Sequence, residues 1–315
     1  MQKKSKKEIL IEIAINNLMD RKMNSGRMSL GVIFLLCIFY SCAHQQKSAT
    51  ESSSKITVMS YNLRYDNPGD SLNSWDHRKE RLVNEVMFYN PDFMGIQEGL
   101  HHQVEYLSQH LPGRKYIGVG RKDGKQDGEY SAIFYNADQF HLVPGSDSTM
   151  WLSKTPGKPS RGWDAALPRI VTWGAFQRND SDKTFYVFNT HFDHKGEMAR
   201  EKSASLILKT IQKVAGDHPV ALAGDFNVPE RKKPYKILTG TFMKDARKIT
   251  SIGPIGPEFT NVISMFVLMC HPKKSQGKGL ITCLLMILSR LTGLLQFPIL
   301  TRDIFYQIIC QSLVN

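Results

Sequence analysis

Between about residue 55 and residue 260, the chain alternates short apolar runs with longer stretches whose apolar residues recur every three or four positions. This recurrence predicts two helices, over 78–89 and 197–215, with charged residues on their outer faces. The apolar positions of these helices are Leu82, Val83, Val86, Leu206, Ile207 and Ile211. Short apolar runs predict further strands at 131–135, 170–177 and 185–190, and 156–168 is typical of a long loop. The pattern as a whole indicates an α/β domain.

Four of the apolar runs end in polar side chains. They predict strands that finish at Asn62, at Gln97-Glu98, at Asn189-Thr190-His191 and at Gly224-Asp225-Phe226-Asn227. Strand ends are where α/β enzymes keep their chemistry, so the four ends predict one polar cluster at a common edge of a sheet or sheet pair. Each end also has an ordinary explanation. Glu98 could be a surface acid and His191 a buried structural histidine, while Asn62 and Asn227 could be turn formers.

Charge and cysteine content narrow the function only slightly. The net charge is +12, but residues 55–260 hold 28 basic and 24 acidic residues, so the flanking segments supply most of the excess. No strong prediction of a polyanionic partner follows. The cysteines at positions 37, 42, 270, 283 and 310 all lie outside 55–260. That region therefore cannot form a disulfide or a thiolate metal site.

The N-terminal segment is typical of an export signal. An apolar run over 30–40 follows Arg27 and is shorter than the ~20 residues that cross a bilayer. Ser41-Cys42 closes the run, and the whole resembles a bacterial lipoprotein signal in which Cys42 becomes the lipidated N-terminus. We therefore interpret 1–41 as an extension with a signal peptide and 42–54 as a flexible tether, and we predict an exported, membrane-anchored envelope protein. An ordinary secretory signal and a buried apolar helix are the alternatives.

In order and approximate spacing, the four strand ends resemble the endonuclease/exonuclease/phosphatase superfamily, which has the deoxyribonuclease I-like fold. The resemblance covers about 55–260, and 62–68 with Trp75 and Arg78-Lys79 is similar to a bacterial lipoprotein-like branch. It implies an α/β fold with four layers, in which two packed mixed β-sheets are flanked by helices.

The resemblance also implies a metal-dependent phosphoesterase, in which activated water hydrolyses a phosphodiester or phosphomonoester. Glu98 is then the ligand of Mg²⁺, or of Mn²⁺ as the alternative, with Asn62 beside it as a ligand or positioner. Asp225 takes the water-orienting or base position, Asn227 orients phosphate, and His191 donates to a phosphate oxygen. Nucleic acid, phospholipid head group, sugar phosphate and inositol phosphate all remain candidate substrates. The predicted partners are this phosphate ester and the membrane, through Cys42, and no protein partner is predicted.

Two motifs of that superfamily are missing after Thr260. Its members continue with an Ile-Asp-Tyr strand and finish with Ser-Asp-His-x-Pro-Val, whereas Asp303 is the only acid in residues 261–315 of this chain. Residues 278–283 and 306–312 can be encoded by codons that translate into the two missing motifs when they are read in another frame. The same alternative frame gives both motifs. We therefore interpret 261–315 as an aberrant, out-of-frame tail and 55–260 as an incomplete domain. A divergent or membrane-inserting tail is the alternative.

A frameshift would have physical consequences, because the lost strands are interior ones in the superfamily. Open sheet edges and exposed apolar faces are expected, together with the loss of the terminal Asp-His pair. The chain as it stands is then predicted to be poorly folded and inactive, and the alternative function is an inactive remnant or a non-catalytic surface lipoprotein. Resequencing the DNA tests the frameshift, since codons that cannot produce the two motifs would contradict it.

Overall fold

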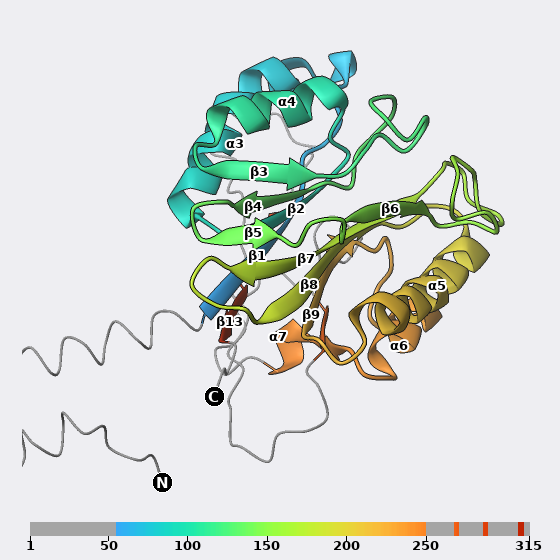
Figure 1. The fold of residues 1–315 in the computed structure, drawn as a ribbon. Helices are drawn as coiled ribbons and strands as arrows, with labels where there is room; N and C mark the ends of the chain where they lie inside the picture. Colours follow the sequence, from blue (N-terminus) through green and yellow to red (C-terminus); the bar gives the residue numbers. More distant parts are fainter. Residues whose placement is uncertain (1–54, 250–267, 271–285, 289–307, 312–315) are drawn as a thin grey trace, which may run out of the picture. The chain divides into compact units, whose positions relative to one another are not determined.

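The computed structural model describes residues 55–249, 268–270, 286–288 and 308–311, all within the compact unit Lys55–Asn315 (Figure 1). The predicted signal over 1–41, the lipidation position Cys42 and the tether over 42–54 lie outside the described residues, as does most of the tail over 261–315. Among the helices of the described part, none has the length and apolar character that crossing a membrane requires.

Two mixed β-sheets form the centre of the fold. The first sheet has the order β12-β1-β2-β4-β3, with β13 also paired to β1. Its strands are β1 (Lys55–Asn62), β2 (Phe93–Gln97), β3 (Arg114–Ile117), β4 (Ile133–Asn136), β12 (Met286–Leu288) and β13 (Ile308–Gln311). The second sheet has the order β10-β11-β9-β8-β7-β5, with β6 also paired to β7. Its strands are β5 (Phe140–Leu142), β6 (Ser148–Trp151), β7 (Ile170–Arg178), β8 (Thr184–His191), β9 (Val220–Asp225), β10 (Lys244–Asp245) and β11 (Leu268–Cys270).

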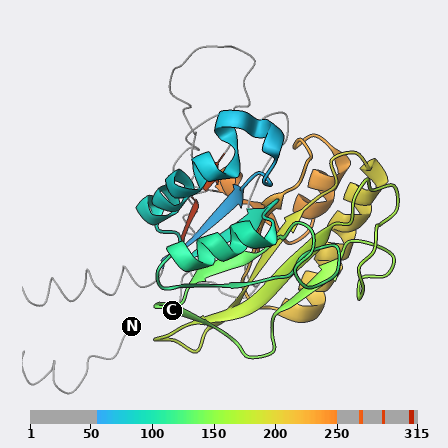
Figure 2. The same ribbon diagram turned by 90° about the horizontal axis from the view of Figure 1, so that it is seen from above.

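Helices cover the outer faces of both sheets. They are η1 (Pro68–Asn73), α3 (Trp75–Tyr89), α4 (His101–His110), α5 (Glu197–Ala215), α6 (Lys233–Thr239) and α7 (Ala246–Ile249). Figure 2 shows α3 and α4 on one side of the sheets and α5 and α6 on the other. The chain therefore has the four-layer α/β sandwich that the sequence predicts.

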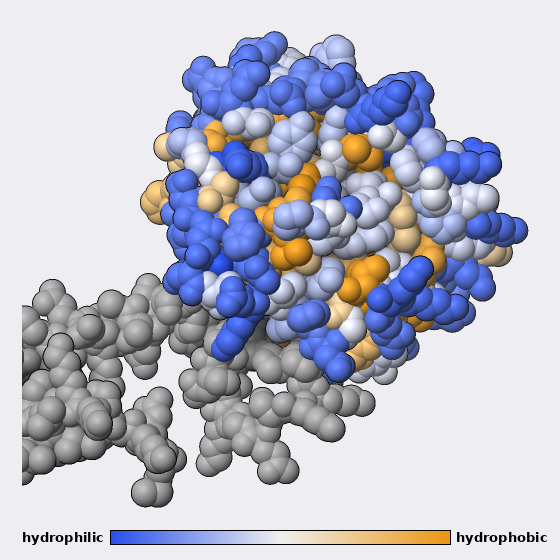
Figure 3. Space-filling view, in the orientation of Figure 1, coloured by the Kyte–Doolittle hydropathy of each residue, from blue (hydrophilic) through white to orange (hydrophobic). Residues whose placement is uncertain are grey.

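Side chains alternate between the two faces of each strand, and the apolar ones form three layers, one between the sheets and one between each sheet and its helices. On β1, Val58 packs between the sheets, whereas its neighbour Met59 packs under α3 and α4. On β9, Ala223 faces the other sheet and Leu222 packs against α5. Successive strand residues point to opposite faces, so each buried strand serves two layers. On the face in Figure 3, hydrophilic residues cover most of the surface and apolar residues appear in separate patches.

A buried amide pair links the two sheets. Gln97 at the end of β2 donates from Nε2 to Oδ1 of Asn189 on β8 at 2.8 Å. Asn189 in turn donates from Nδ2 to the carbonyl oxygens of Ile96 and Ala132, at 2.7 and 2.9 Å. Both amide side chains are fully buried. Since a buried polar group without a partner is costly, these bonds favour one alignment of the sheets.

The observed helices agree closely with the predicted ones. The predicted helix over 197–215 has the same bounds as α5, and α3 begins at Trp75, three residues before the predicted start at 78. Helix α3 ends as predicted because Asn90 adopts the left-handed conformation, with a φ of 43°.

Short tail strands occupy edges that we expected to be open. Strand β12 pairs in parallel with Met59–Tyr61 of β1, β13 pairs in antiparallel fashion with Lys55–Val58 of β1, and β11 pairs with β9. The expectation of open edges is wrong at these positions. Main-chain pairing uses N–H and C=O groups that almost any sequence carries, so short tail segments can cover these edges.

Gly95 leaves the space that the amide pair requires. A Cβ at Gly95 would lie 2.7 Å from Cγ and Oδ1 of Asn189, whose amide is held by three hydrogen bonds. Gly95→Ala should therefore lower the free energy of unfolding by about 1 to 3 kcal/mol, measured by urea denaturation. Gly157→Ala is the control, because a Cβ there meets nothing within 4 Å. Equal stabilities of the two variants would contradict this account.

Candidate active site

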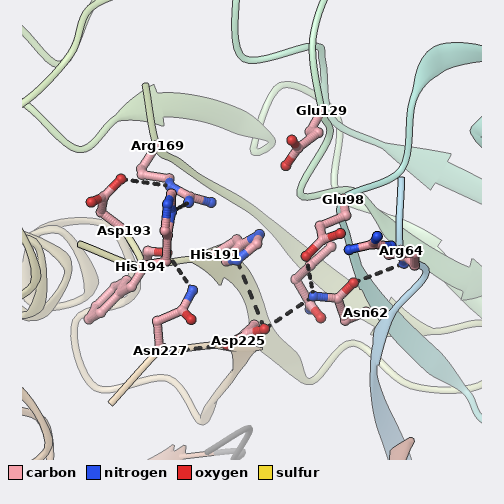
Figure 4. Close-up of polar contacts among 12 residues, drawn as sticks. Asn62, Arg64, Glu98, Glu129, Arg169, His191, Asp193, His194, Asp225 and Asn227 are labelled. Carbon is pink, nitrogen blue, oxygen red and sulfur yellow. Dashed lines mark hydrogen bonds and ion pairs between the residues drawn. The ribbon is translucent and has the colours of Figure 1, made fainter. Parts of the chain in front are cut away.

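The strand ends that the sequence singled out meet at one place. Parallel pairing of β1 with β2 sets Asn62 opposite Gln97, which precedes Glu98, and parallel pairing of β8 with β9 sets His191 opposite Asp225. Because the two sheets pack face to face, the two pairs of strand ends face each other (Figure 4). The structure thus brings together the five predicted site residues of the domain, Asn62, Glu98, His191, Asp225 and Asn227, whereas Cys42 lies outside the described residues.

Asn62 joins the two carboxylates. Its Nδ2 donates to Oε1 of Glu98 at 2.9 Å and to Oδ2 of Asp225 at 3.1 Å. Its Oδ1 accepts the backbone N–H of Arg64 at 2.9 Å, and Oε2 of Glu98 accepts the backbone N–H of Tyr65 at 3.2 Å. In this arrangement the amide nitrogen faces both acids, and its two hydrogen bonds join the carboxylates of Glu98 and Asp225.

Burial raises the pKa of Asp225 and lowers the pKa of His191. Burial raises the pKa of Asp225 to about 6, against the opposing effect of the hydrogen bonds from Asn62 and from the backbone of Asn227. His191 places Nε2 3.9 Å from Oδ2 of Asp225. Burial, followed by the positive charges of Arg169 and Arg121, holds the pKa of His191 well below its ordinary value. A neutral imidazole therefore lies beside a carboxyl group that titrates near neutrality.

Two site residues have unusual backbone conformations. Glu98 and Asn227 have φ values of 63° and 48°, in the left-handed region that residues other than glycine seldom adopt. Asn227 donates its backbone N–H to Oδ1 of Asp225 at 3.1 Å and its Nδ2 to the carbonyl oxygen of Phe192 at 2.9 Å. Such strain persists where surrounding contacts fix it, and it is common at functional sites.

Helices α3 and α4 hold the loop that follows Asn62. Arg78 of α3 donates from Nη1 to the carbonyl oxygen of Leu63 at 2.7 Å and from Nη2 to that of Arg64 at 3.1 Å. Gln103 of α4 donates to the same Arg64 oxygen at 3.1 Å. Arg78, which the sequence marks only as part of a resemblance, is thus a buried clamp that fixes the site loop.

A second charged cluster lies beside the site, and sequence reasoning missed most of it. Asp193 is buried, and its Oδ1 accepts the backbone N–H groups of Ala166 and Gly196 at 3.1 and 2.8 Å. Its Oδ2 lies 3.3 Å from Nε of Arg169, whose Nη2 is 3.0 Å from Nδ1 of His194. Burial acts to raise the pKa of Asp193, but the backbone N–H groups and Arg169 outweigh it and hold the pKa below the ordinary value.

Arg121, which is buried, forms another ion pair next to the site with the half-buried Glu129, with Nη2 and Oε1 2.7 Å apart. Both residues lie inside the loop between β3 and β4, several residues away from the end of either strand. The rule that located the other site residues therefore could not find them. Arg169 was also missed, since it comes directly before β7.

The donor set fits a magnesium-type ion. Glu98 and Asp225 supply carboxylate oxygens on either side of one amide, and Mg²⁺ commonly binds proteins through one or two carboxylates while it keeps several waters. Among the described residues, no group of three or more His, Cys, Asp or Glu side chains forms a cage for a metal. The described residues thus suit a partly hydrated ion better than a fully enclosed one.

Comparison with known proteins agrees with this geometry. Residues 59–261 match the model of the endonuclease/exonuclease/phosphatase family. A solved structure of an endonuclease/exonuclease/phosphatase from Bacteroides vulgatus is 33% identical, with a TM-score of 0.70, over 82% of this chain and 99% of that one. The mannosyl-6-phosphatase of Bacteroides thetaiotaomicron is 32% identical, with a TM-score of 0.67, over 81% of this chain and 98% of that one.

Curated relatives match over less of their length. A protein of Acanthamoeba polyphaga mimivirus is 32% identical over 169 residues, which are 51% of this chain and 62% of that protein. A probable RNA exonuclease of Schizosaccharomyces pombe is 26% identical over 235 residues, which are 68% of this chain and 43% of that protein. The chain therefore spans about two fifths to three fifths of the length of these curated relatives.

Asp193 should contribute to stability in a pH-dependent way. Asp193→Asn should lower the free energy of unfolding by about 3 kcal/mol at neutral pH, because it leaves Arg169 buried without its charge partner. The folded-state pKa lies below the ordinary value of 3.8, so the ionised group stabilises the fold above that value. The difference between variant and parent should shrink as the pH falls below it. Urea unfolding across this range measures the effect, with the exposed Asp217→Asn as the control. A difference that stays constant with pH would contradict the assignment.

Proposed function

The chain belongs to the endonuclease/exonuclease/phosphatase family, and from this we propose that it is a metal-dependent phosphoesterase. From the apolar run that ends at Ser41-Cys42 we propose that a lipid on Cys42 attaches it to a membrane. Members of the family are hydrolases that act on phosphate esters, as the names of the phosphatase and of the exonuclease among the relatives indicate. The observation that carries the enzymatic proposal is the hydrogen-bonded row Glu98, Asn62 and Asp225, with His191 beside it.

Glu98 would hold the metal ion in this proposal, and Asn62 would orient its carboxylate. Enzymes of the family generally use divalent ions such as Mg²⁺, and Mn²⁺ is the alternative. When bound, the ion supplies positive charge that offsets the charge of the phosphate group. The raised pKa of Asp225 supports the same proposal, since a nearby divalent cation would favour its ionised form.

Asp225 and His191 would divide the remaining chemistry. The carboxylate of Asp225, held beside His191, can orient water and accept its proton. The backbone N–H of Asn227 occupies Oδ1 of Asp225, and Oδ2 faces His191 and Asn62. His191 is neutral, so it can donate one N–H to a phosphate oxygen without first gaining a proton. Asn227 would help to orient the phosphate.

A second candidate is an inactive remnant or a non-catalytic surface lipoprotein. It is favoured by one observation, the absence of the Ile-Asp-Tyr and Ser-Asp-His motifs after Thr260. In that case the site would keep its geometry but lack the terminal Asp-His pair, and the out-of-frame tail proposed above would be the cause.

Glu98→Ala separates the two candidates when it is made in a chain whose reading frame has been restored. Loss of the metal ligand should lower Mg²⁺-dependent turnover by about 10²- to 10³-fold, measured on a panel of phosphate esters with and without Mg²⁺. Glu80→Ala, which removes an exposed glutamate of α3, should leave turnover unchanged. An inactive restored parent supports the remnant, and turnover by the unrestored chain would contradict its predicted inactivity.

The lipid anchor has its own test. The intact mass of protein extracted from membranes should correspond to a chain that begins at a diacylated Cys42. Cys42→Ser should release the protein from the membrane, because stable attachment depends on the acyl chains. A mature species that still carries Met1 is incompatible with this processing.

A further inference from the structure

Two buried arginines lie beside the candidate active site, and the chemistry proposed above uses neither. Arg121 lies in the loop between β3 and β4, and Arg169 comes directly before β7. Their exposed fractions are 7% and 4%. Each lies against one carboxylate, because Nη2 of Arg121 is 2.7 Å from Oε1 of Glu129, and Nε of Arg169 is 3.3 Å from Oδ2 of Asp193.

The guanidinium group of Arg169 has more N–H donors than its neighbours accept. Its Nε faces Asp193 and its Nη2 faces His194, but its Nη1 is buried and has no hydrogen-bond partner in the described part of the chain. A buried N–H of a charged group is costly when it has no acceptor. In Figure 4 the end of the Arg169 side chain extends toward the space between His191 and Glu129.

Arg169 shares its carboxylate partner with the backbone. Asp193 also accepts four backbone N–H groups, so only part of its charge serves Arg169. Burial lowers the pKa of Arg121 to about 10, and the like charge of Arg169 acts in the same direction in spite of Glu129. Like charges held together away from water are unfavourable unless an anion joins them.

An ion-pair network that served stability alone would be expected to use its buried donors. The unpartnered Nη1 of Arg169 points instead to a ligand with oxygen acceptors. The location beside His191 narrows this ligand to the phosphate group of the substrate, whose oxygens can accept the free N–H of Arg169. A terminal phosphomonoester carries nearly two charges and three free oxygens, whereas an internal phosphodiester carries one charge and two free oxygens.

We propose that Arg121 and Arg169 receive the oxygens of a doubly charged phosphate group, so that the site selects a terminal phosphomonoester over an internal phosphodiester. This inference rests on the proposed function, since it names the substrate class of the same site. Its test measures binding, so its failure can be distinguished from the failure of the hydrolase assignment.

The experiment titrates the full chain with phenylphosphonate and with benzenesulfonate, in Mg²⁺ and in chelator, by isothermal titration calorimetry at alkaline pH. The two probes share a ring and a tetrahedral head group, neither is a hydrolysable ester, and they carry two and one negative charges. The unsubstituted chain should bind the phosphonate about tenfold more tightly or better, as expected for hydrogen bonds to charged groups.

The variants then assign this selectivity to the arginines. The double variant Arg121→Gln with Glu129→Gln replaces the ion pair by a neutral amide pair. It should lower phosphonate affinity about tenfold while sulfonate affinity changes less than about threefold. Arg169→Lys keeps the charge beside Asp193 but removes the forked donors, and it should have the same effect. Lys122→Gln, at the exposed neighbouring position, should change neither affinity.

Thermal unfolding of each variant shows whether it folds, and Arg169→Lys replaces the double variant if that one does not. Equal binding of the two probes by the parent chain, or no binding, would overturn the proposal. So would variants that keep the selectivity or lose both affinities equally. Selective binding together with no turnover by the chain whose reading frame has been restored would refute the hydrolase assignment and leave this inference standing. Turnover without selective binding of the phosphonate would refute this inference and leave the hydrolase assignment standing.

Discussion

The hydrogen bond between Gln97 and Asn189 joins the two sheets, and the placement of the candidate active-site residues depends on it. Glu98 follows Gln97 by one residue and His191 follows Asn189 by two, so the contact that aligns the sheets also sets the distance between acid and imidazole. Gly95 provides the room for it. The site is therefore positioned by a polar contact in the interior, where a lost partner is costly, and its surface loops adjust to that alignment.

Charge is distributed unevenly around the site. Asn62 bridges the carboxylates of Glu98 and Asp225 on one side, while Arg121 and Arg169 lie on the other, each beside one carboxylate. His191 lies between the two sides and stays neutral because burial and both arginines oppose its protonation. The carboxylates would suit a cation, and the free N–H of Arg169 would suit an oxygen acceptor, so the arrangement is compatible with a phosphate group as ligand.

The strongest local patterns predicted both the fold and most of the site. Helix α5 has the predicted bounds, because Gly196 and Gly216 flank a long amphipathic run. Shorter elements without a clear period were missed, including β3, β5, β6 and α6, which have three to seven residues. The rule that chemistry follows a strand found Glu98, His191 and Asp225. It could not find Arg169, which comes directly before β7, or Arg121, which lies within the long loop between β3 and β4.

By itself, the sequence determined which residues end the buried strands, because alternation and turn formation depend on neighbours a few positions away. Only the tertiary structure decided which of those residues touch. The bond between Asn62 and Asp225 spans 163 positions, and no local pattern encodes it. The same holds for the buried ion pair of Asp193 with Arg169, because Asp193 lies in a loop and nothing in its local sequence indicates this contact. Such contacts depend on how two sheets pack, and packing is a property of the whole domain.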